Sequence, residues 1–208
     1  MHRCRLIFVL IFFVSSYTVQ AEYKINLTFE SGFKLKSQEQ LLPKLINAGS
    51  KKSIEKIISN QDWIKSYSIA YKPFKKNINI NIVNREPLFA LNEDFFYDSS
   101  LIKFKYDQSS KNFIMVSGPI RDVENILIII NHFDLIVGSK LEINYIKYNH
   151  ATGWDLYYKN ILIRLGKEFS KEKFINLKDT LNYLLANSKI PSIIDMRYKD
   201  GVALKYGE

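Results

Sequence analysis

Few side chains in this chain could carry out catalysis or bind a metal. Apart from His2, the only histidines are His132 and His150, and neither has the HxxxH or HExxH spacing that binds zinc from one helix face. His132 ends an apolar helical pattern, where a half-buried structural histidine is the simpler interpretation, and His150 falls on an expected loop tip. Ser117-Gly118-Pro119 is typical of a turn into a helix, and the chain has no GxSxG serine motif. We therefore expect no enzyme activity, no metal or other cofactor, and no small-molecule substrate.

The single cysteine, Cys4, precedes a long apolar segment. The chain after that segment can form no disulfide and supplies no thiolate nucleophile. The stability of this part must come from hydrophobic cores, and the hydrophobic content of the whole sequence, 47%, is ordinary for a globular protein.

The formal net charge of +9 raises the question of a nucleic-acid or anionic membrane partner. The lysines are scattered along the chain, without an arginine-rich run or a stacked basic–aromatic motif. A solvated, lysine-rich surface explains the charge more simply, so we expect no nucleic-acid partner.

The first 21 residues predict export from the cytoplasm. His2, Arg3 and Arg5 precede sixteen uncharged residues, 6–21, of which the first nine are all apolar. A basic stretch before an apolar one leaves the N-terminus in the cytoplasm and exports the rest of the chain. As a helix the segment would span about 24 Å, somewhat short of a hydrocarbon core of about 30 Å. Val19-Gln20-Ala21 has the spacing of a signal-peptidase site, so a cleaved signal and a retained anchor both stay open here.

The last fifteen residues, 194–208, predict a closing hairpin. Asp200-Gly201 is a tight-turn dipeptide between two short runs rich in β-forming residues. The final strand could leave backbone N–H and C=O groups free for a strand of another chain. Asp195 and Arg197 alternate with apolar neighbours, which is compatible with the solvent face of a strand. Tyr198 and Tyr206 are of the type that anchors interfaces, so the pattern indicates a protein that functions by being bound.

Residues 22–86 have the pattern of a small α+β unit. Strands are expected at 23–29, 63–71 and 77–83, and helices at 37–47, capped by Ser37, and at 51–59. The last strand is the clearest, since Ile78, Ile80 and Ile82 alternate with asparagines. The order strand–helix–helix–strand–strand predicts two helices packed on one face of a sheet.

Pro87 interrupts this pattern, because proline cannot continue a central strand, and residues 87–208 predict a second α+β domain with a mainly antiparallel sheet and two helices. Strands are expected near 88–92, 95–98, 101–106, 113–116, 141–148, 154–158 and 161–165, and helices at 121–133 and 170–186. Trp63 and Trp154 should be core anchors. The joint at Glu86-Pro87 should be compact, with a possible Arg85–Glu86 ion pair.

Several short motifs, taken in order, resemble the FtsQ/DivIB family of bacterial cell-division proteins over nearly the whole chain. Asp62-Trp63-Ile64-Lys65, the alternating isoleucine strand and Asn84-Arg85-Glu86-Pro87 resemble the end of the family's POTRA domain. Gly118-Pro119 resembles its turn before a long helix, and Gly153-Trp154-Asp155-Leu156 with Leu165-Gly166 resembles its central hairpin. The stretch from Ile194 to Tyr198, with Gly201, resembles its closing motif.

The resemblance implies a short cytoplasmic N-terminus (1–5), a single transmembrane signal-anchor helix (6–21), a POTRA domain (22–86) and an FtsQ-like β domain (87–208). It also implies a non-catalytic scaffold at the septum of the bacterial inner membrane, with most of the chain in the periplasm. Such a scaffold links early and late division proteins and binds an FtsB/FtsL-like partner by strand addition. The implied partner-binding residues are Arg197, Tyr198, Asp200, Gly201, Val202, Leu204 and Tyr206. Tyr206 stands where the family often has tryptophan, and Lys205 replaces a small residue.

Two other functions remain open from the sequence. A secreted or anchored POTRA-type module for outer-membrane protein assembly or secretion would share the first domain, but it would usually have repeated POTRA units or a β-barrel. A periplasmic hydrolase would use His132 or His150.

Overall fold

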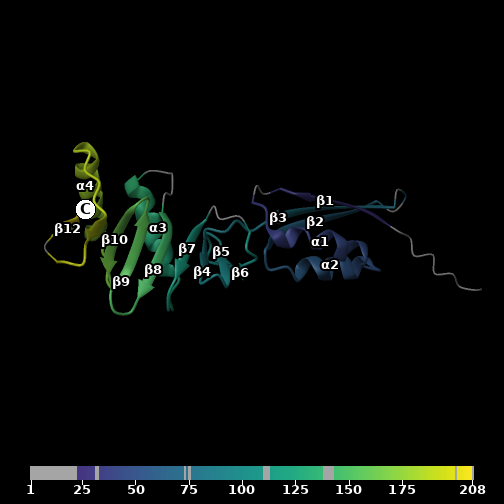
Figure 1. Ribbon diagram of the computed structural model, residues 1–208. Helices are drawn as coiled ribbons and strands as arrows, with labels where there is room; N and C mark the ends of the chain where they lie inside the picture. Colours follow the sequence, from purple (N-terminus) through teal and green to yellow (C-terminus); the bar gives the residue numbers. More distant parts are fainter. Residues whose placement is uncertain are drawn as a thin grey trace, which may run out of the picture.

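The computed structural model describes residues 23–207 apart from 31–32, 73, 75, 110–112, 138–142 and 200. The described chain is elongated, with a three-stranded sheet towards one end and the C-terminal strand at the other (Figure 1).

The three-stranded sheet has the order β1 (Lys24–Phe29), β3 (Asn77–Asn84), β2 (Ile64–Lys72), with β1 parallel and β2 antiparallel to β3. As the alternation predicted, Ile78, Ile80 and Ile82 are buried on one face. On the other face Asn26 Nδ2 donates to Asn79 Oδ1 at 2.9 Å. The isoleucines pack with helices α1 (Leu41–Ile46) and α2 (Lys51–Ser59), which lie together beside the sheet (Figure 1).

The expected start of the first helix was wrong. A 3-10 turn (Lys36–Gln38) precedes α1, which begins only at Leu41. Ser37 does not cap it, because its backbone N–H and its hydroxyl both donate to Asp107 Oδ2, each at 2.9 Å. A long-range carboxylate therefore takes the hydrogen bonds that a local cap would have made.

The second sheet has nine strands in the order β12-β11-β10-β9-β8-β7-β4-β5-β6. Five of its neighbouring pairs are antiparallel, and three, β10–β11, β4–β7 and β7–β8, are parallel. Its strands are β4 (Phe89–Leu91), β5 (Phe95–Tyr97), β6 (Lys103–Lys105), β7 (Ile114–Ser117), β8 (Ile143–Asn149), β9 (Gly153–Tyr158), β10 (Ile161–Gly166), β11 (Ile193–Asp195) and β12 (Ala203–Lys205).

Helices α3 (Glu124–Val137) and α4 (Lys171–Ala186) pack with the β7–β11 part of this sheet around one apolar core. Ser170 caps α4 as predicted, with its hydroxyl accepting from the Lys173 N–H. Trp154 is buried in this core, and Trp63 is buried in the core of the three-stranded sheet, so both are core anchors as predicted.

The two sheets share an apolar cluster at their joint. Ala90, Phe96, Phe104 and Phe113, from the second sheet and its loops, belong to the same buried cluster as the isoleucines of β3. Phe96 lies at the centre, with its ring 4.9–6.3 Å from the rings of its aromatic neighbours Phe33, Phe104, Tyr106 and Phe113.

The expected ion pair at the joint was wrong in its partner. Arg85 Nη1 pairs with Asp98 Oδ2 at 2.9 Å rather than with Glu86, and Arg85 Nε donates to the Asp62 carbonyl. Asp98 is buried, so this pair is better shielded than the exposed pair expected from the sequence.

The expected architecture must be corrected at its N-terminal end. Helices α1 to α4 are the α-helices of the described residues, and none is long and apolar enough to cross a membrane. The expected membrane helix, 6–21, lies outside the described residues. The described fold is therefore α+β, with four α-helices, a three-stranded sheet and a mixed nine-stranded sheet, and the single membrane helix is not part of it.

Candidate docking edge at the C-terminal strand

Strand β12 forms one edge of the nine-stranded sheet. It pairs antiparallel with β11, with Ile194 opposite Leu204 and Asp195 opposite Ala203. Within the described chain no strand pairs with the other side of β12. This is the free edge expected from the sequence, and it can accept one more strand.

The connection between β11 and β12 differs from the expected tight turn. It runs from Met196 to Val202, seven residues, instead of turning only at Asp200-Gly201. The backbone N–H of Arg197 donates to Asp195 Oδ1 at 3.1 Å, which turns the chain away from the sheet directly after β11. The segment 196–202 is therefore an exposed loop beside the edge, apart from the buried Met196 and the half-buried Val202, with Asp200 outside the described residues.

The predicted site residues divide into exposed and core-facing groups. Tyr198 is 59% exposed and Tyr206 46%, so both aromatic rings are available to a partner. Gly201 has nothing within 4 Å of the position of a side chain. Val202 and Leu204 are half-buried and pack against the larger core, so they hold the edge in place and present only part of their surface.

Arg197 is held by Asp195, which the sequence pattern did not predict. Arg197 Nε donates to both carboxylate oxygens of Asp195, at 2.9 and 3.1 Å, and Nη2 lies 2.5 Å from Oδ2. Asp195 is only 8% exposed, so its assignment to a solvent face was wrong. The hydrogen bonds from Arg197 lower the pKa of Asp195, which stays ionised and fixes the guanidinium in one orientation. Nη1 takes no part in these bonds.

Asp195 belongs to a row of charges across the sheet. The strand register places Lys147 beside Asp155, Asp155 beside Arg164, and Arg164 beside Asp195. Each pair of neighbouring strands in this row thus places opposite charges side by side. The row ends at Ala203 on β12, a small residue that leaves space next to Asp195 at the free edge.

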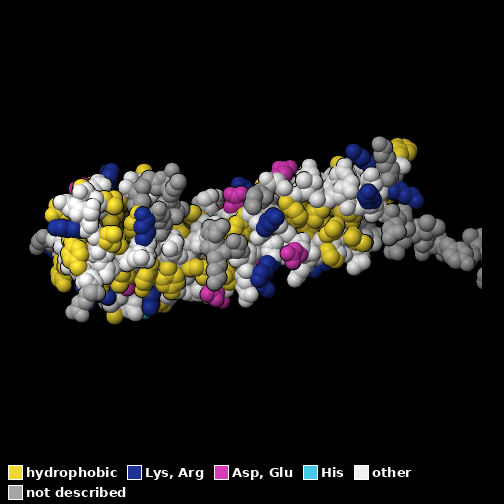
Figure 2. All heavy atoms as spheres, turned by 45° about the horizontal axis from the view of Figure 1, so that its top comes forward, with side chains coloured by type: hydrophobic (Ala, Val, Ile, Leu, Met, Phe, Trp, Pro, Cys, Tyr) yellow, Lys and Arg dark blue, Asp and Glu magenta, His cyan; other side chains and the backbone are white. Residues whose placement is uncertain are grey.

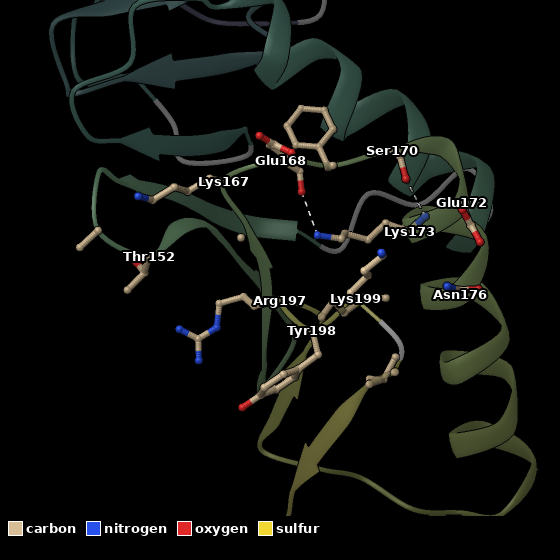
Figure 3. A pocket seen from close by; sticks show the side chains of 16 residues that line it. Thr152, Lys167, Glu168, Ser170, Glu172, Lys173, Asn176, Arg197, Tyr198 and Lys199 are labelled. Carbon is tan, nitrogen blue, oxygen red and sulfur yellow. Dashed lines mark hydrogen bonds between the residues drawn. The ribbon is translucent and has the colours of Figure 1, made fainter.

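A cavity of about 760 Å³ opens beside the loop, between it and the start of α4. Its lining carries four cationic side chains, Lys167, Lys173, Arg197 and Lys199, against the two carboxylates of Glu168 and Glu172. In Figure 3, Lys199 points towards Lys173 across the cavity, whereas Arg197 and Tyr198 point the other way. The excess of positive charge favours an acidic or anionic partner segment.

Two of these lysines play different parts. Lys173 Nζ donates to the carbonyls of Leu165 and Glu168, at 2.9 and 2.8 Å, so it holds the end of β10 against α4. Lys199 lies on the exposed loop beside the edge. Neither lysine was among the residues expected at this site, and their spacing in the chain carries no signal that would identify them.

Glycines Gly153 and Gly166 let the chain pass close beneath Arg197. Both have left-handed backbones, with φ of 85° and 86°, and a Cβ on Gly153 would overlap the carbonyl of Gly166. A Cβ on Gly166 would in turn lie 3.3 Å from Cγ of Arg197. Both glycines belong to motifs of the sequence, but their spacing did not predict this contact.

The two histidines among the described residues pack against aromatic rings. The ring of His132 stacks on Phe174 at 4.6 Å, and His150 meets the edge of Tyr148 at 5.5 Å. Within the described residues, no group of three or more His, Cys, Asp or Glu side chains could hold a metal ion.

No protein-family model matches this chain, and no curated protein matches it in sequence.

Proposed function

We propose that the protein is a non-catalytic scaffold of the bacterial division machinery that binds an FtsB/FtsL-like partner by strand addition at β12. The observation that carries this proposal is the position of β12, which pairs with β11 on one side and is followed by the exposed Tyr206. The motif resemblance supplies the identity of the partner.

The chemistry of the edge supports this mode of binding. Partner backbone groups would pair with the free side of β12, and Tyr198 and Tyr206 would cover apolar partner side chains. Arg197, with its Nε and Nη2 engaged by Asp195, can offer Nη1 to a partner carboxylate without losing its own fixed orientation. Lys199 would extend the attraction to a second acidic group.

The opposite edge of the same sheet is a poorer docking site. Strand β6 carries two exposed lysines, Lys103 and Lys105, whereas β12 carries one, Lys205, and lysines on an edge oppose strand addition. The backbone N–H of Lys105 also donates to Asp62 Oδ2 at 2.9 Å. The joint between the sheets therefore occupies part of that edge.

In this role the described part of the chain would lie on the periplasmic side of the bacterial inner membrane, enriched at the septum. Residues 1–21 support export, with basic residues preceding an uncharged apolar run. The mass of the mature protein in the membrane fraction tests whether the chain is cut after Ala21.

The edge is tested by co-purification of the full-length protein with an FtsB-like partner. Tyr198→Ala and Arg197→Glu should each abolish co-purification, because one removes an exposed aromatic contact and the other reverses the charge offered to the partner. Circular dichroism should show that both variants stay folded.

Tyr67→Ala is the matched control, because Tyr67 is a 41% exposed tyrosine on β2 of the other sheet. It should co-purify as the wild type does. Normal binding by both edge variants would refute docking at β12, and depletion that removes outer-membrane proteins without making cells filamentous would refute the division role.

A further inference from the structure

One end of the three-stranded sheet carries a fully exposed aromatic side chain between lysines. Phe74, in the connection between β2 and β3, has a relative exposure of 102%, so its ring contacts almost nothing in the described chain. Lys72 and Lys76 flank it and are exposed. An apolar ring held in water in this way costs free energy unless something else covers it.

The first strand adds a third lysine at the same place. The register aligns both Lys24 and Lys72 with Asn77, so all three strands have an end here. The Lys24 N–H donates to the Lys76 carbonyl at 2.9 Å. We call Lys24, Lys72, Phe74 and Lys76 the hairpin tip.

The N-terminus of α2 brings further charge to this end. Lys51 Nζ lies 4.4 Å from the centroid of the ring of Tyr71, the residue that precedes Lys72. Glu55 contacts the hydroxyl of the same tyrosine at 3.5 Å and offsets one of these charges. In Figure 2, Lys and Arg side chains gather at this end of the molecule around a protruding hydrophobic group.

The sequence that precedes β1 indicates that the partner of the hairpin tip is a membrane. The uncharged run 6–21 ends three residues before Lys24. Three residues span at most about 10 Å. If the run enters a membrane, during export or afterwards, the hairpin tip is therefore brought to the surface of that membrane.

We propose that the hairpin tip is a membrane-surface contact that inserts Phe74 into the headgroup region of an anionic bilayer while its lysines bind lipid phosphates. An exposed phenylalanine surrounded by lysines is a composition that suits the interface between a bilayer and water. The attraction depends on anionic lipid and is screened by salt. A protein partner would gain little from one protruding ring, since a stable interface buries roughly 1,000 Å² or more. This inference goes beyond the proposed division role and does not depend on it.

The test uses the full-length chain with Phe74→Trp, reconstituted into nanodiscs of phosphatidylglycerol and phosphatidylcholine with brominated acyl chains. Bromine quenches tryptophan only at short range, so insertion should quench Trp at position 74. The buried Trp63 and Trp154 give the background, which is measured on the unsubstituted chain. Quenching should weaken in discs of phosphatidylcholine alone and at high salt.

Tyr67→Trp is the control for proximity to the membrane without insertion. Position 67 is exposed on β2, about 17 Å from Lys72 at the end of that strand. Position 74 should be quenched at least roughly twofold more than position 67. Lys72→Glu with Lys76→Glu should remove the difference, whereas Lys103→Glu with Lys105→Glu, an equal change of charge on β6, should leave it intact.

Three results would overturn the proposal. Equal quenching at positions 74 and 67 would mean proximity without insertion. Equal quenching in charged and neutral discs would remove the role of the lysines. An unquenched Trp at position 74 with an emission maximum typical of water would leave the tip free for a protein partner and make the lipid assignment wrong.

Discussion

At the scale of single residues, the ion pair of Asp195 and Arg197 fixes the orientation of the arginine side chain beside the candidate docking edge. Asp195 is nearly buried, and Arg197 is about one third exposed and fixed by it. An arginine held in this way loses less conformational entropy when it binds a carboxylate. The pair is therefore more important for positioning Arg197 than for the stability of the fold.

Asp195→Asn should lower the free energy of unfolding by about 1 kcal/mol at pH 7, because screening of the part-exposed Arg197 keeps the pair weak. The pKa of Asp195 is lowered in the folded state, so its contribution is present above the unfolded value near 3.8 and is lost as pH falls through the folded value. Urea unfolding at pH 7 and pH 3 should show that the difference in free energy of unfolding between this variant and wild type is smaller at the lower pH. A constant difference would contradict this assignment.

The charge of Asp155 should have the opposite effect on the free energy of unfolding. Burial raises its pKa, with partial compensation by Arg164 and Arg197, and Oδ1 has no hydrogen-bond partner among the described residues. Asp155→Asn should be neutral or raise the free energy of unfolding by up to about 1 kcal/mol at pH 7. The gain should shrink as pH falls and the wild-type carboxyl is protonated, which the same urea series would measure. A clear loss of stability at pH 7 would show that the charge row needs this carboxylate.

At the scale of elements, the contact between the start of β9 and the end of β10 decides where the loop after β11 can run. Gly153 and Gly166 both have positive φ, and a Cβ on Gly153 would overlap the backbone of Gly166. Arg197 then lies over Gly166. The hairpin β9–β10 thus forms the surface on which the loop 196–202 rests.

Gly153→Ala should destabilise the protein by about 2–4 kcal/mol, because the new Cβ meets backbone atoms that cannot move aside and the left-handed φ adds strain. Gly201→Ala is the matched control, since nothing lies within 4 Å of that position. Its free energy of unfolding should stay within about 0.5 kcal/mol of wild type. Thermal unfolding of both variants is the measurement, and similar losses in the two would refute the close approach of β9 and β10.

At the scale of the whole molecule, the two sheets are joined by a continuous core. Phe96 on β5 contacts Phe33, which lies after β1 in the chain, and belongs to the cluster that also contains the isoleucines of β3. The Arg85–Asp98 pair and the hydrogen bonds from Ser37 to Asp107 cross the same joint. A shared core of this kind should make the described part of the chain unfold as one cooperative unit.

Phe96→Ala should cost about 3–5 kcal/mol and separate the unfolding of the two sheets, because it removes the ring at the centre of the joint. Scanning calorimetry should show one transition for wild type and two for the variant. Phe95→Ala is the matched control, because Phe95 is the neighbouring ring on β5 and is 40% exposed. It should keep the single transition. Two transitions already present in wild type would contradict a shared core.

The sequence predicted most elements, because helices and strands are encoded in local periodicity. The alternation of Ile78, Ile80 and Ile82 identified the buried face of β3, and Ser170 marked the start of α4. Local pattern failed where a distant group intervened. Asp107 took the hydrogen bonds of Ser37, and Asp98 took the place of Glu86 beside Arg85.

By itself, the sequence of this protein determined the presence of a terminal strand with aromatic neighbours and the apolar run before β1. Only the tertiary structure decided that β12 lies at a free edge, that Asp195 holds Arg197, and that Phe74 and three lysines meet at one end of the molecule. The physical reason is the range of the interactions. Side-chain alternation is fixed by neighbouring residues, whereas sheet order and charge pairing depend on contacts between segments that are far apart in the chain.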